Sequence, residues 1–310
     1  MKVTVLKGGR SLERGVSLRS AARVEDALER LGHAAVAIDA DRELVNRLGE
    51  VAPDVAFVAM HGPGGEDGTA QELLELLGIP FTGPGVAACG RCMDKVVAKQ
   101  ALRAANVPTP DWFAFNQTAF RELGAADALG ALEERLGFPL VVKPSRGGSA
   151  LGVKFAGGGG EVPAALVSAF SYDERVLLER FVEGRELAVS VLGSEPLPIV
   201  EAIPANGDRY DFEARYEIGR TDFVCPARLD GGKEEAVTAT ALAAYEALGC
   251  SGFSRVDLIL GPDGPQVLEV NAIPGLTDTS LLPQAAEAAG ISFERLVERI
   301  LELALQPAAA

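Results

Sequence analysis

Two apolar segments near the carboxyl end of the chain carry polar side chains that could do chemistry. One begins at Arg255, the other ends at Asn271, and a Gly-Pro-Asp-Gly turn separates them. Apolar runs on either side of a turn cluster predict a β-hairpin. Side chains alternate along a strand, so folding about Asp263 places Asp257 opposite Glu269. Arg255 then lies opposite Asn271 on the same face.

The polar face of this predicted hairpin indicates a metal and phosphate site. A structural hairpin seldom gathers two carboxylates, an amide and a guanidinium on strands that are otherwise apolar. Oxygen ligands at this density favour Mg²⁺, and Mg²⁺ held by a few carboxylates usually also binds nucleotide phosphates. The residue types alone do not name a reaction.

A second candidate for phosphate binding is the strand that ends in Lys143 and the small-residue loop after it, 145–152. Backbone amides in such a loop can cradle a phosphate, while the lysine supplies a point charge. The alternative is a flexible hairpin tip, but a lysine inside an apolar strand favours phosphate. The loop is not a Walker A motif, because Gly-Lys-[Ser/Thr] is absent.

Glu13 and His61 follow two strands of a predicted N-terminal α/β unit. Alternating strands and helices over residues 2–77 predict a parallel sheet covered by helices, with ligands at the carboxyl ends of the strands. Both loops begin there and can share one crevice. From spacing alone, Glu13 is better explained as a solvated loop charge, and a lone His at a strand end is more often structural than catalytic.

Hydrophobic periodicity and turn residues predict the remaining elements. The predicted helices are 86–105, 118–136, 161–171, 232–248, 281–289 and 292–305, and the strands are 111–115, 138–143, 176–182 and 185–192. An acidic side chain at the end of the strand 176–182 either binds an adenine amino group or ribose, or is a solvated strand end. The polar stretch 204–228 is expected to be irregular, and so long a loop is either disordered or functional.

Length, charge and cysteine spacing favour a globular protein of several domains over a membrane-spanning or nucleic-acid-binding one. A chain of 310 residues suits two or three domains, and its net charge of −15 argues against a general binder of nucleic acid or anionic membrane. No apolar run reaches the length of a membrane span, and the start is too short for a signal-peptide core, so we expect a cytoplasmic protein. Cys225 and Cys250 stand far from Cys89 and Cys92, which favours buried thiols over a zinc site.

Several blocks of residues, in one order along the chain, resemble the D-alanine–D-alanine ligases of the ATP-grasp superfamily. Each block is weak alone, but the ordered set is specific and runs nearly from end to end. The blocks are Gly8-Gly9…Ser11…Glu13…Val16-Ser17, His61-Gly62…Gly65-Glu66-Asp67-Gly68…Gln71, Met93-Asp94-Lys95, Val142-Lys143-Pro144…Gly148-Ser149…Gly152, Tyr210-Asp211…Glu213…Tyr216, Arg255…Asp257 and Glu269…Asn271…Pro274-Gly275…Thr277…Ser280.

The resemblance implies an α/β fold of three domains. An N-terminal parallel-sheet domain, 1–84, would bind substrate. Two ATP-grasp domains with antiparallel sheets, 85–182 and 183–310, would hold ATP between them, and the second would carry the metal site. It also suggests a homodimer formed through the N-terminal domain.

The resemblance further implies residues for the nucleotide and its metal ions. Asp257, Glu269 and Asn271 would hold two Mg²⁺ ions, with Mn²⁺ as an alternative. Glu186 would bind the ribose, and Arg215 would help to neutralise the phosphate in transfer. The full set implied to bind ATP is Lys95, Lys143, Ser149, Glu179, Phe181, Val182, Glu186 and Arg215.

The resemblance also implies residues for two D-alanine molecules. Glu13, with His61 nearby, would hold the ammonium of the first. Ser280 and Leu281 would bind the carboxylate of the second. An oxyanion hole would consist of Arg255 and the backbone amide of Gly275. Ser149 and Tyr216 would join the network of Glu13 and close a mobile loop over the site.

The implied reaction joins two D-alanines at the expense of ATP, through a D-alanyl phosphate, for peptidoglycan synthesis. Three positions depart from the family pattern: Gly147 replaces a common Glu, Ala150 a common Ser, and Arg215 a common Lys. Gly147 removes a carboxylate that would orient Tyr216. Two alternatives stay open: the same chemistry with D-serine or D-lactate as second substrate, and a regulator that binds ATP without catalysis. Tyr216 argues against D-lactate, since depsipeptide-forming relatives tend to carry His there.

Overall fold

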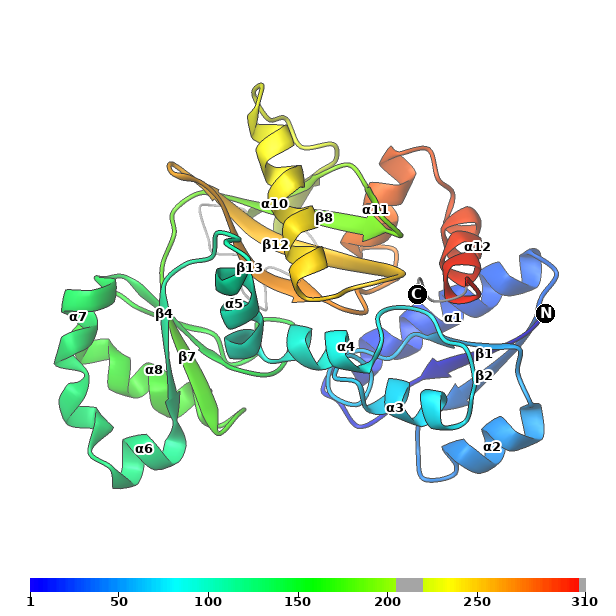
Figure 1. Ribbon diagram of the computed structural model, residues 1–310, viewed down its shortest axis with the longest axis horizontal. Helices are drawn as coiled ribbons and strands as arrows, with labels where there is room; N and C mark the ends of the chain where they lie inside the picture. The colour runs from blue at the N-terminus through cyan, green and yellow to red at the C-terminus, as the bar shows by residue number, and fades with distance from the viewer. Residues whose placement is uncertain (205–219, 307–310) are drawn as a thin grey trace.

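The predicted mixed α/β architecture is confirmed in the computed structural model of the chain, which describes residues 1–204 and 220–306. These residues form one parallel sheet and two antiparallel sheets with helices packed against them (Figure 1). Each sheet is built from one stretch of the chain.

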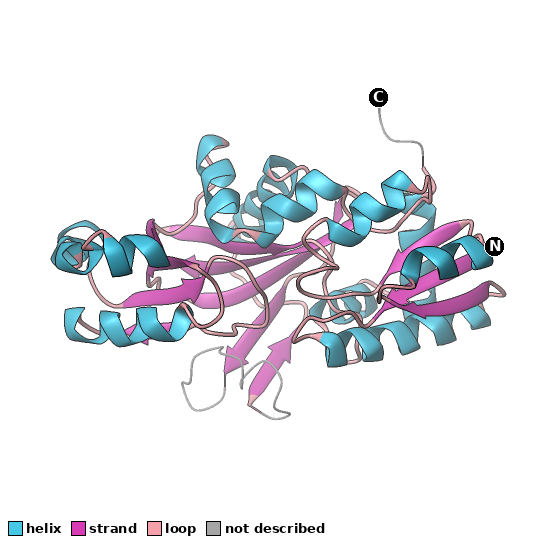
Figure 2. Ribbon diagram, turned by 90° about the horizontal axis from the view of Figure 1, so that it is seen from below, coloured by secondary structure: helices cyan, strands magenta, loops and turns pink. Residues whose placement is uncertain are grey.

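The first sheet is parallel, with strand order β2-β1-β3, as the alternating pattern of residues 2–77 predicts. Its strands are β1 (Lys2–Lys7), β2 (Ala34–Asp39) and β3 (Val55–Val58). Its helices are α1 (Arg14–Arg30), α2 (Leu44–Val51) and α3 (Thr69–Leu76). Helix α1 lies on one side of the sheet, and α2 and α3 lie on the other (Figures 1 and 2). The carboxyl ends of β1 and β3 therefore open at one edge, toward the loops of Glu13 and His61.

The second sheet is antiparallel, with strand order β4-β7-β5-β6. Its strands are β4 (Trp112–Asn116), β5 (Leu140–Pro144), β6 (Lys154–Ala156) and β7 (Arg175–Arg180), and α8 (Val162–Ala169) packs on it. The predicted helix 118–136 is wrong as one element. It divides into α6 (Gln117–Glu122), a short 3₁₀ turn (Ala125–Ala128) and α7 (Gly130–Leu136). Gly124 follows α6 with φ +70°, a left-handed conformation that ends helices.

The third sheet has the strand order β11-β10-β8-β12-β13, with β9 paired to β8. The strands are β8 (Arg185–Leu192), β9 (Glu195–Pro196), β10 (Val200–Pro204), β11 (Thr221–Val224), β12 (Phe253–Gly261) and β13 (Gly264–Asn271). Helices α10 (Lys233–Ala247), α11 (Leu281–Ala288) and α12 (Phe293–Ala304) follow the prediction closely. Strand β11 corrects the expectation that 204–228 is irregular throughout, because β10 supplies its antiparallel partner.

The predicted single helix 86–105 is interrupted at Asp94. Helix α4 (Val86–Met93) ends there and α5 (Lys95–Ala104) begins. Asp94 has extended backbone angles, and its side chain accepts hydrogen bonds from the N–H groups of Val96 and Val97. Asp favours this capping arrangement over a helix interior, which explains the break.

Three hydrophobic cores hold the molecule together. One runs from the first sheet to the third and includes the inner faces of α1, α10, α11 and α12. Another lies on the opposite side of the first sheet, against α2 and α3. The four-stranded sheet has a separate core with α7 and α8. Helices α4 and α5 contact β13, and α12 packs on α1, so the end of the chain returns to its beginning (Figure 1).

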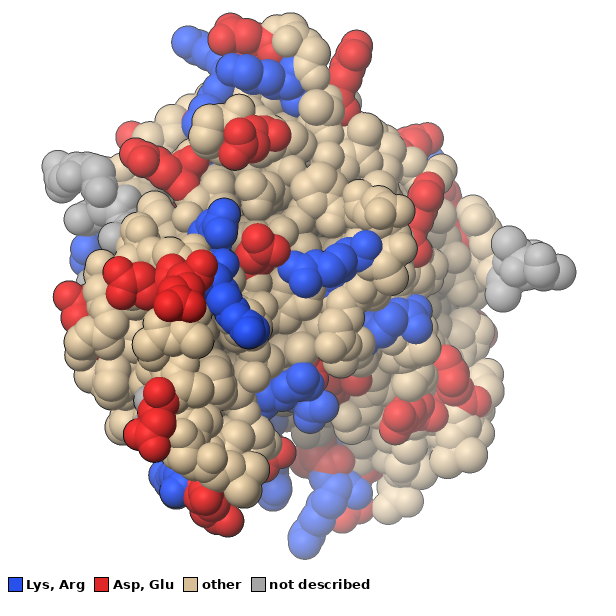
Figure 3. Space-filling model, turned by 60° about the vertical axis from the view of Figure 1, so that its left-hand side comes forward, with Lys and Arg blue, Asp and Glu red and all other residues tan. Residues whose placement is uncertain are grey.

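Surface charge is mixed rather than segregated on the face drawn in Figure 3, where Lys and Arg alternate with Asp and Glu. Among the described residues, no helix has both the length and the hydropathy to cross a membrane.

Candidate active site

The hairpin β12–β13 has the predicted register, with Asp257 opposite Glu269 and Arg255 opposite Asn271. A bulge between Asp257 and Leu258 is part of the reason. The turn itself holds two residues, because Gly261 pairs with Gly264. That turn alone would bring Asp257 opposite Leu268, and the bulge adds the one residue that restores the carboxylate pair.

The polar face of the hairpin is held by charge pairs. The guanidinium of Arg255 donates to both carboxylate oxygens of Asp257, at 2.6 and 2.7 Å. The Nδ2 of Asn271 donates to Asp257 Oδ2 at 3.1 Å. Lys95 Nζ lies 3.3 Å from Glu269 Oε2, which links α5 to the hairpin. The resemblance implies that Arg255 belongs to an oxyanion hole apart from the metal ligands, whereas here it contacts one of those ligands directly.

A cavity of about 500 Å³ lies between the second and third sheets. That volume suits a nucleotide-sized ligand. Ile259, Ala202 and Val153 contribute apolar wall, and Asp257 and Glu269 close one end. Six of the residues predicted to bind ATP line it: Lys95, Lys143, Glu179, Phe181, Val182 and Glu186.

Lys143 and Lys99 share one buried carboxylate at the wall of this cavity. Lys143 Nζ lies 2.7 Å from Glu179 Oε1, and Lys99 Nζ pairs with Glu179 Oε2. Burial would raise the pKa of Glu179, but the two lysines hold it below its usual value. Burial likewise lowers the pKa of Lys99 to about 8, against the attraction of Glu179. In the sequence, Lys99 is only one residue of the predicted helix 86–105. Its spacing of four residues from Lys95 does not reveal a partner 80 positions away, at Glu179.

The loop 145–152 borders the same cavity and is anchored to α5. Ser145 Oγ donates to Asp94 Oδ1 at 2.8 Å, and the backbone N–H of Lys95 donates to Ser145 O at 2.9 Å. The ammonium of Lys95 donates to the carbonyl of Gly147 at 2.6 Å. Ser149 and Ala150 have φ of 57° and 55°, a left-handed conformation uncommon for residues with a side chain. Such strain is typical of loops that serve a site.

A smaller cavity of about 100 Å³ adjoins the loop and the same polar face of the hairpin. It gathers the residues predicted to handle the two amino acids: Glu13, His61, Ser149, Arg255, Gly275, Ser280 and Leu281, together with Asn271. Leu281 also lines the larger cavity. The side chains on one face of the hairpin are thus divided, with Asp257 and Glu269 toward one cavity and Arg255 and Asn271 toward the other.

Glu13 is not the solvated loop charge that spacing favours. Its carboxylate accepts a hydrogen bond from Ser149 Oγ, as the resemblance implies. Burial, and next the charge of Glu66, raise the pKa of Glu13, and the Ser149 hydrogen bond opposes them. A Cβ on Gly148 would lie 3.0 Å from Glu13 Oε2, so a residue without a side chain suits this contact.

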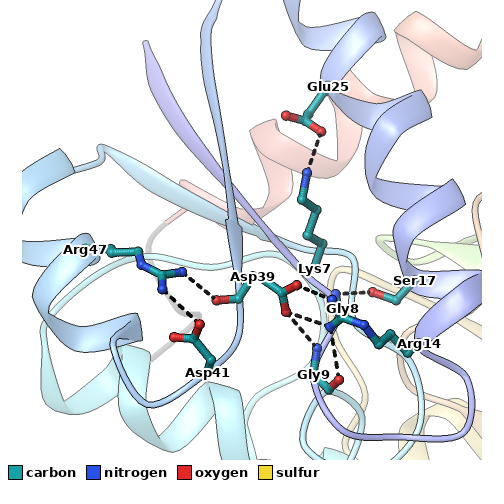
Figure 4. A network of polar contacts seen from close by, with 9 residues as sticks. All are labelled: Lys7, Gly8, Gly9, Arg14, Ser17, Glu25, Asp39, Asp41 and Arg47. Atoms are coloured by element: carbon teal, nitrogen blue, oxygen red, sulfur yellow. Dashed lines mark hydrogen bonds and ion pairs between the residues drawn. The ribbon is translucent and has the colours of Figure 1, made fainter.

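Side chains from α1 and β2 fix the loop that carries Glu13 (Figure 4). Arg14 pairs with Asp39 and donates to the carbonyl of Gly9 at 3.1 Å. Ser17 accepts from the Gly8 N–H at 2.8 Å and donates to Ala59 O at 2.8 Å. The Gly8-Gly9 turn thus supports the loop of Glu13.

The segment after β13 completes the smaller cavity. His61 is buried, and its Nδ1 lies 3.0 Å from the carbonyl of Ile273. Ser280 Oγ accepts from the Thr277 N–H at 3.0 Å, and a Cβ on Gly275 would lie 2.7 Å from that oxygen. Arg215 and Tyr216 lie outside the described residues, as do Tyr210, Asp211 and Glu213.

Cys250 is not isolated, contrary to the expectation from the sequence. Its Sγ lies 3.6 Å from Cys92 Sγ, although the two are 158 positions apart. All four cysteines are free thiols.

The residues of the hairpin fit a divalent cation. Asp257 and Glu269 are directly opposed and Asn271 adds an amide, which matches the oxygen donors of Mg²⁺. Both carboxylates already face cationic groups, Arg255 and Lys95. Within residues 1–204 and 220–306, no three His, Cys, Asp or Glu side chains cluster for a metal. A cation here would have two carboxylates and one amide from the chain, which leaves room for phosphate oxygens.

Comparison with known proteins gives one family. The family models described as "D-ala D-ala ligase N-terminus" and "D-ala D-ala ligase C-terminus" match residues 45–84 and 101–302. A D-alanine–D-alanine ligase of Synechococcus sp. (strain JA-3-3Ab) is 44% identical over 313 residues, covering 100% of this chain and 95% of that protein.

Solved structures agree with this comparison. The Bacillus anthracis D-alanine–D-alanine ligase complexed with ATP has a TM-score of 0.84 at 34% identity, covering 98% of this chain and 97% of that one. The VanG D-Ala:D-Ser ligase of Enterococcus faecalis has a TM-score of 0.82 at 28% identity, covering 98% and 99%.

Proposed function

Because the chain belongs to the D-alanine–D-alanine ligase family, with its ATP-grasp fold, we propose that it joins two D-alanine molecules at the expense of ATP, which yields D-alanyl-D-alanine for peptidoglycan. The observation that carries this proposal is the pair of adjoining cavities that share the polar side chains of one hairpin face. One has the size and charge for a nucleotide, and the other has an anion, Glu13, and a cation, Arg255, for an amino acid.

We infer the following roles in the smaller cavity. The carboxylate of Glu13 binds the ammonium of the first D-alanine and directs its carboxylate toward the larger cavity. Phosphoryl transfer to that carboxylate gives an acyl phosphate. The amine of the second D-alanine, whose carboxylate lies at Ser280 and Leu281, attacks the carbonyl carbon. Arg255 and the Gly275 N–H stabilise the oxyanion that forms, a contribution of roughly 3 kcal/mol for one such donor.

In the larger cavity, Lys95 and Lys143 would contact the phosphates of ATP, and Glu186 would bind the ribose. Phe181 and Val182 form apolar wall for the base, and Glu179 fixes the position of Lys143. Asp257, Glu269 and Asn271 would hold Mg²⁺ or Mn²⁺, which supplies charge neutralisation for phosphoryl transfer. Arg215 and Tyr216 are proposed as the cation and the lid residue that complete the site.

The proposal is tested by phosphate release from ATP and Mg²⁺ over a panel of D-amino and D-hydroxy acids, with product masses. We expect release that depends on D-alanine and a product of the mass of D-alanyl-D-alanine. Absence of D-alanine-dependent release would reject the function. ATP binding without turnover on any acid of the panel would instead favour the regulator.

D-serine as second substrate is kept as an alternative because of one position. Gly147 lacks the carboxylate common in the family, and the VanG relative named above is a D-Ala:D-Ser ligase. Incubation with D-alanine plus D-serine or D-lactate separates these outcomes by product mass.

We also propose a homodimer formed through the N-terminal domain, 1–84, which sedimentation analysis can measure. Large apolar side chains are exposed on that domain at Leu12, Leu76 and Val45. Since the proposed reaction consumes ATP, we place the enzyme in the cytoplasm. Domains 85–182 and 183–310 are proposed to grip the nucleotide.

A further inference from the structure

We propose that Ser20 and Arg23, two residues of α1 with no place in the roles above, position the Gly275 amide for peptide-bond formation. The inference rests on the proposed function. Helix α1 belongs to the N-terminal unit, whereas Gly275 follows β13 of the third sheet. The donor that stabilises the oxyanion would therefore be set in place by a different part of the chain.

The side chains of Ser20 and Arg23 bind the backbone N–H and the backbone carbonyl of one residue, Leu276. The N–H of Leu276 donates to Ser20 Oγ at 3.1 Å, and the carbonyl of Leu276 accepts from Arg23 Nη1 at 3.1 Å. Ser20 is completely buried. Arg23 in turn pairs with Asp278 at 2.9 Å and lies 3.8 Å from the centre of the Phe293 ring. Both backbone polar groups of Leu276, one in each of its two peptide units, are thus held by α1.

His61 holds the other end of the same segment. Its Nδ1 lies 3.0 Å from the carbonyl of Ile273, and its Nε2 lies 2.9 Å from Ser20 Oγ. A carbonyl can only accept, so Nδ1 carries the ring proton and donates it. With one ring proton, Nε2 then accepts from the Ser20 hydroxyl. That hydroxyl is left with a lone pair for the Leu276 N–H, so every donor in this chain of contacts has an acceptor.

Gly275 lies between these two anchors. We call Ser20, Arg23 and His61, with their contacts to this segment, the clamp. Pro274 has no N–H, and the N–H of Leu276 donates to Ser20. Of the three residues 274–276, Gly275 therefore carries the one N–H that the clamp does not occupy. Gly275 lines the smaller cavity together with Arg255. Rigid anchors on both sides hold this donor where charge develops, which is how an oxyanion hole avoids reorganisation during reaction.

The consequence concerns the fate of the acyl phosphate. In productive turnover the amine nitrogen bonds to the carbonyl carbon, and the carbon–oxygen bond to phosphate breaks with its electron pair on phosphate. The proton that the amine loses passes to the departing phosphate. A displaced Gly275 amide slows this attack. Water can instead attack the phosphorus atom, which forms no oxyanion on the carbonyl. The P–O bond to the acyl oxygen then breaks, and D-alanine and phosphate are returned without a dipeptide. Loss of the clamp should therefore raise the phosphate released per dipeptide formed, which a general loss of folded enzyme would not do.

The experiment measures phosphate and D-alanyl-D-alanine together for wild type, Ser20→Ala and Arg23→Met. Wild type should release one phosphate per dipeptide. Both variants should exceed one and should form dipeptide roughly ten- to hundredfold more slowly, as a misplacement of about 1 Å does, while KM for ATP is unchanged. Ser20→Thr, which keeps the hydroxyl, should restore much of the coupling. Arg23→Met alters a partly exposed residue and serves if Ser20→Ala does not fold.

Thr82→Val is the matched control. Thr82 is equally buried in the N-terminal unit, and its hydroxyl accepts a hydrogen bond from the Val58 N–H at 2.9 Å, away from both cavities. It should lose stability as Ser20→Ala does and yet release one phosphate per dipeptide. A ratio of one in both Ser20→Ala and Arg23→Met would overturn the inference. A wild type inactive on D-alanine would instead overturn the proposed function.

Discussion

The guanidinium of Arg255 has two interaction partners, Asp257 in an ion pair and the oxyanion that we propose it stabilises. Replacement by Met removes a charged donor from the second and leaves a carboxylate of the hairpin without its partner. We expect Arg255→Met to lower kcat by at least about a hundredfold. Arg255→Lys should recover little, because an ammonium cannot make the two parallel bonds. Arg299→Met, which breaks a surface ion pair with Glu195, should leave kcat unchanged; equal losses in both Arg→Met variants would contradict the role.

Glu13 predicts a dependence on pH. Its pKa is raised by burial and then by Glu66, and only the ionised carboxylate attracts the ammonium of D-alanine. As pH falls, Glu13 is therefore protonated earlier than an ordinary Glu, and KM for D-alanine rises. Glu66→Gln removes the neighbouring charge, so this rise should move to lower pH. Glu72→Gln, on the exposed side of α3, should leave the profile of KM against pH in place. An identical profile in Glu66→Gln would refute this coupling.

Lys99 predicts a change on the alkaline side. Its pKa is lowered to about 8, so it loses its charge as pH rises through that value. Glu179 is then balanced by Lys143 alone and competes more strongly with ATP for it. KM for ATP should increase above about pH 8. Lys99→Met should have the higher KM for ATP already at pH 7, and its KM should not rise further near pH 8. A rise of KM near pH 8 that persists in this variant would mean that another group titrates there.

Some residues of the site could be predicted from the sequence and others could not. Asp257, Glu269, Arg255 and Asn271 could be found because one hairpin brings them together by alternation and register. Lys99 and Ser20 could not, because each acquires its role from a partner on another element. Ser20 in particular reads as an ordinary small residue of an amphipathic helix.

At the scale of elements, Asp94 sets the orientation of α5 and therefore of Lys95. Asp94→Ala removes the cap of α5 and the acceptor of the Ser145 hydroxyl. We expect a loss of about 1–2 kcal/mol in the free energy of unfolding, measured with urea, and a higher KM for ATP. Asp94→Asn keeps a capping oxygen and should retain most of the stability. No difference between the two variants would argue against the capping role.

The elements that sequence predicted well are those with a strong local signal. The alternating unit 2–77 and the helices α10 and α12 have clear periodicity and clear stops. The predicted helices 86–105 and 118–136 overlooked a capping Asp and a helix-ending Gly, since the periodicity continues across both. Strand β11 is four residues long and depends on β10, a partner that polar composition does not reveal.

At the scale of the molecule, the larger cavity is walled by two units with separate cores. A ligand that contacts both walls should join them. We expect ATP with Mg²⁺, at one hundred times its dissociation constant, to add about 2.7 kcal/mol to the free energy of unfolding. Lys143→Met should abolish this at the same concentration. Hydrogen exchange should slow in β5 and β12 together; slowing in one unit alone would contradict a nucleotide site shared by both.

The sequence indicated both crevices, but not that the two adjoin one face of one hairpin. That arrangement depends on how three sheets pack, and packing between segments more than a hundred residues apart leaves no local pattern. The resemblance to known ligases supplied the reaction, and the structure divided the polar side chains of one hairpin face between the two cavities.

The central claim is that the first D-alanine is activated as an acyl phosphate between the two cavities. D-alanine labelled with ¹⁸O in its carboxylate tests it directly, with ATP and Mg²⁺ and mass analysis of the released phosphate. The account predicts one ¹⁸O atom transferred to phosphate for each dipeptide formed. Dipeptide formed with unlabelled phosphate would contradict it.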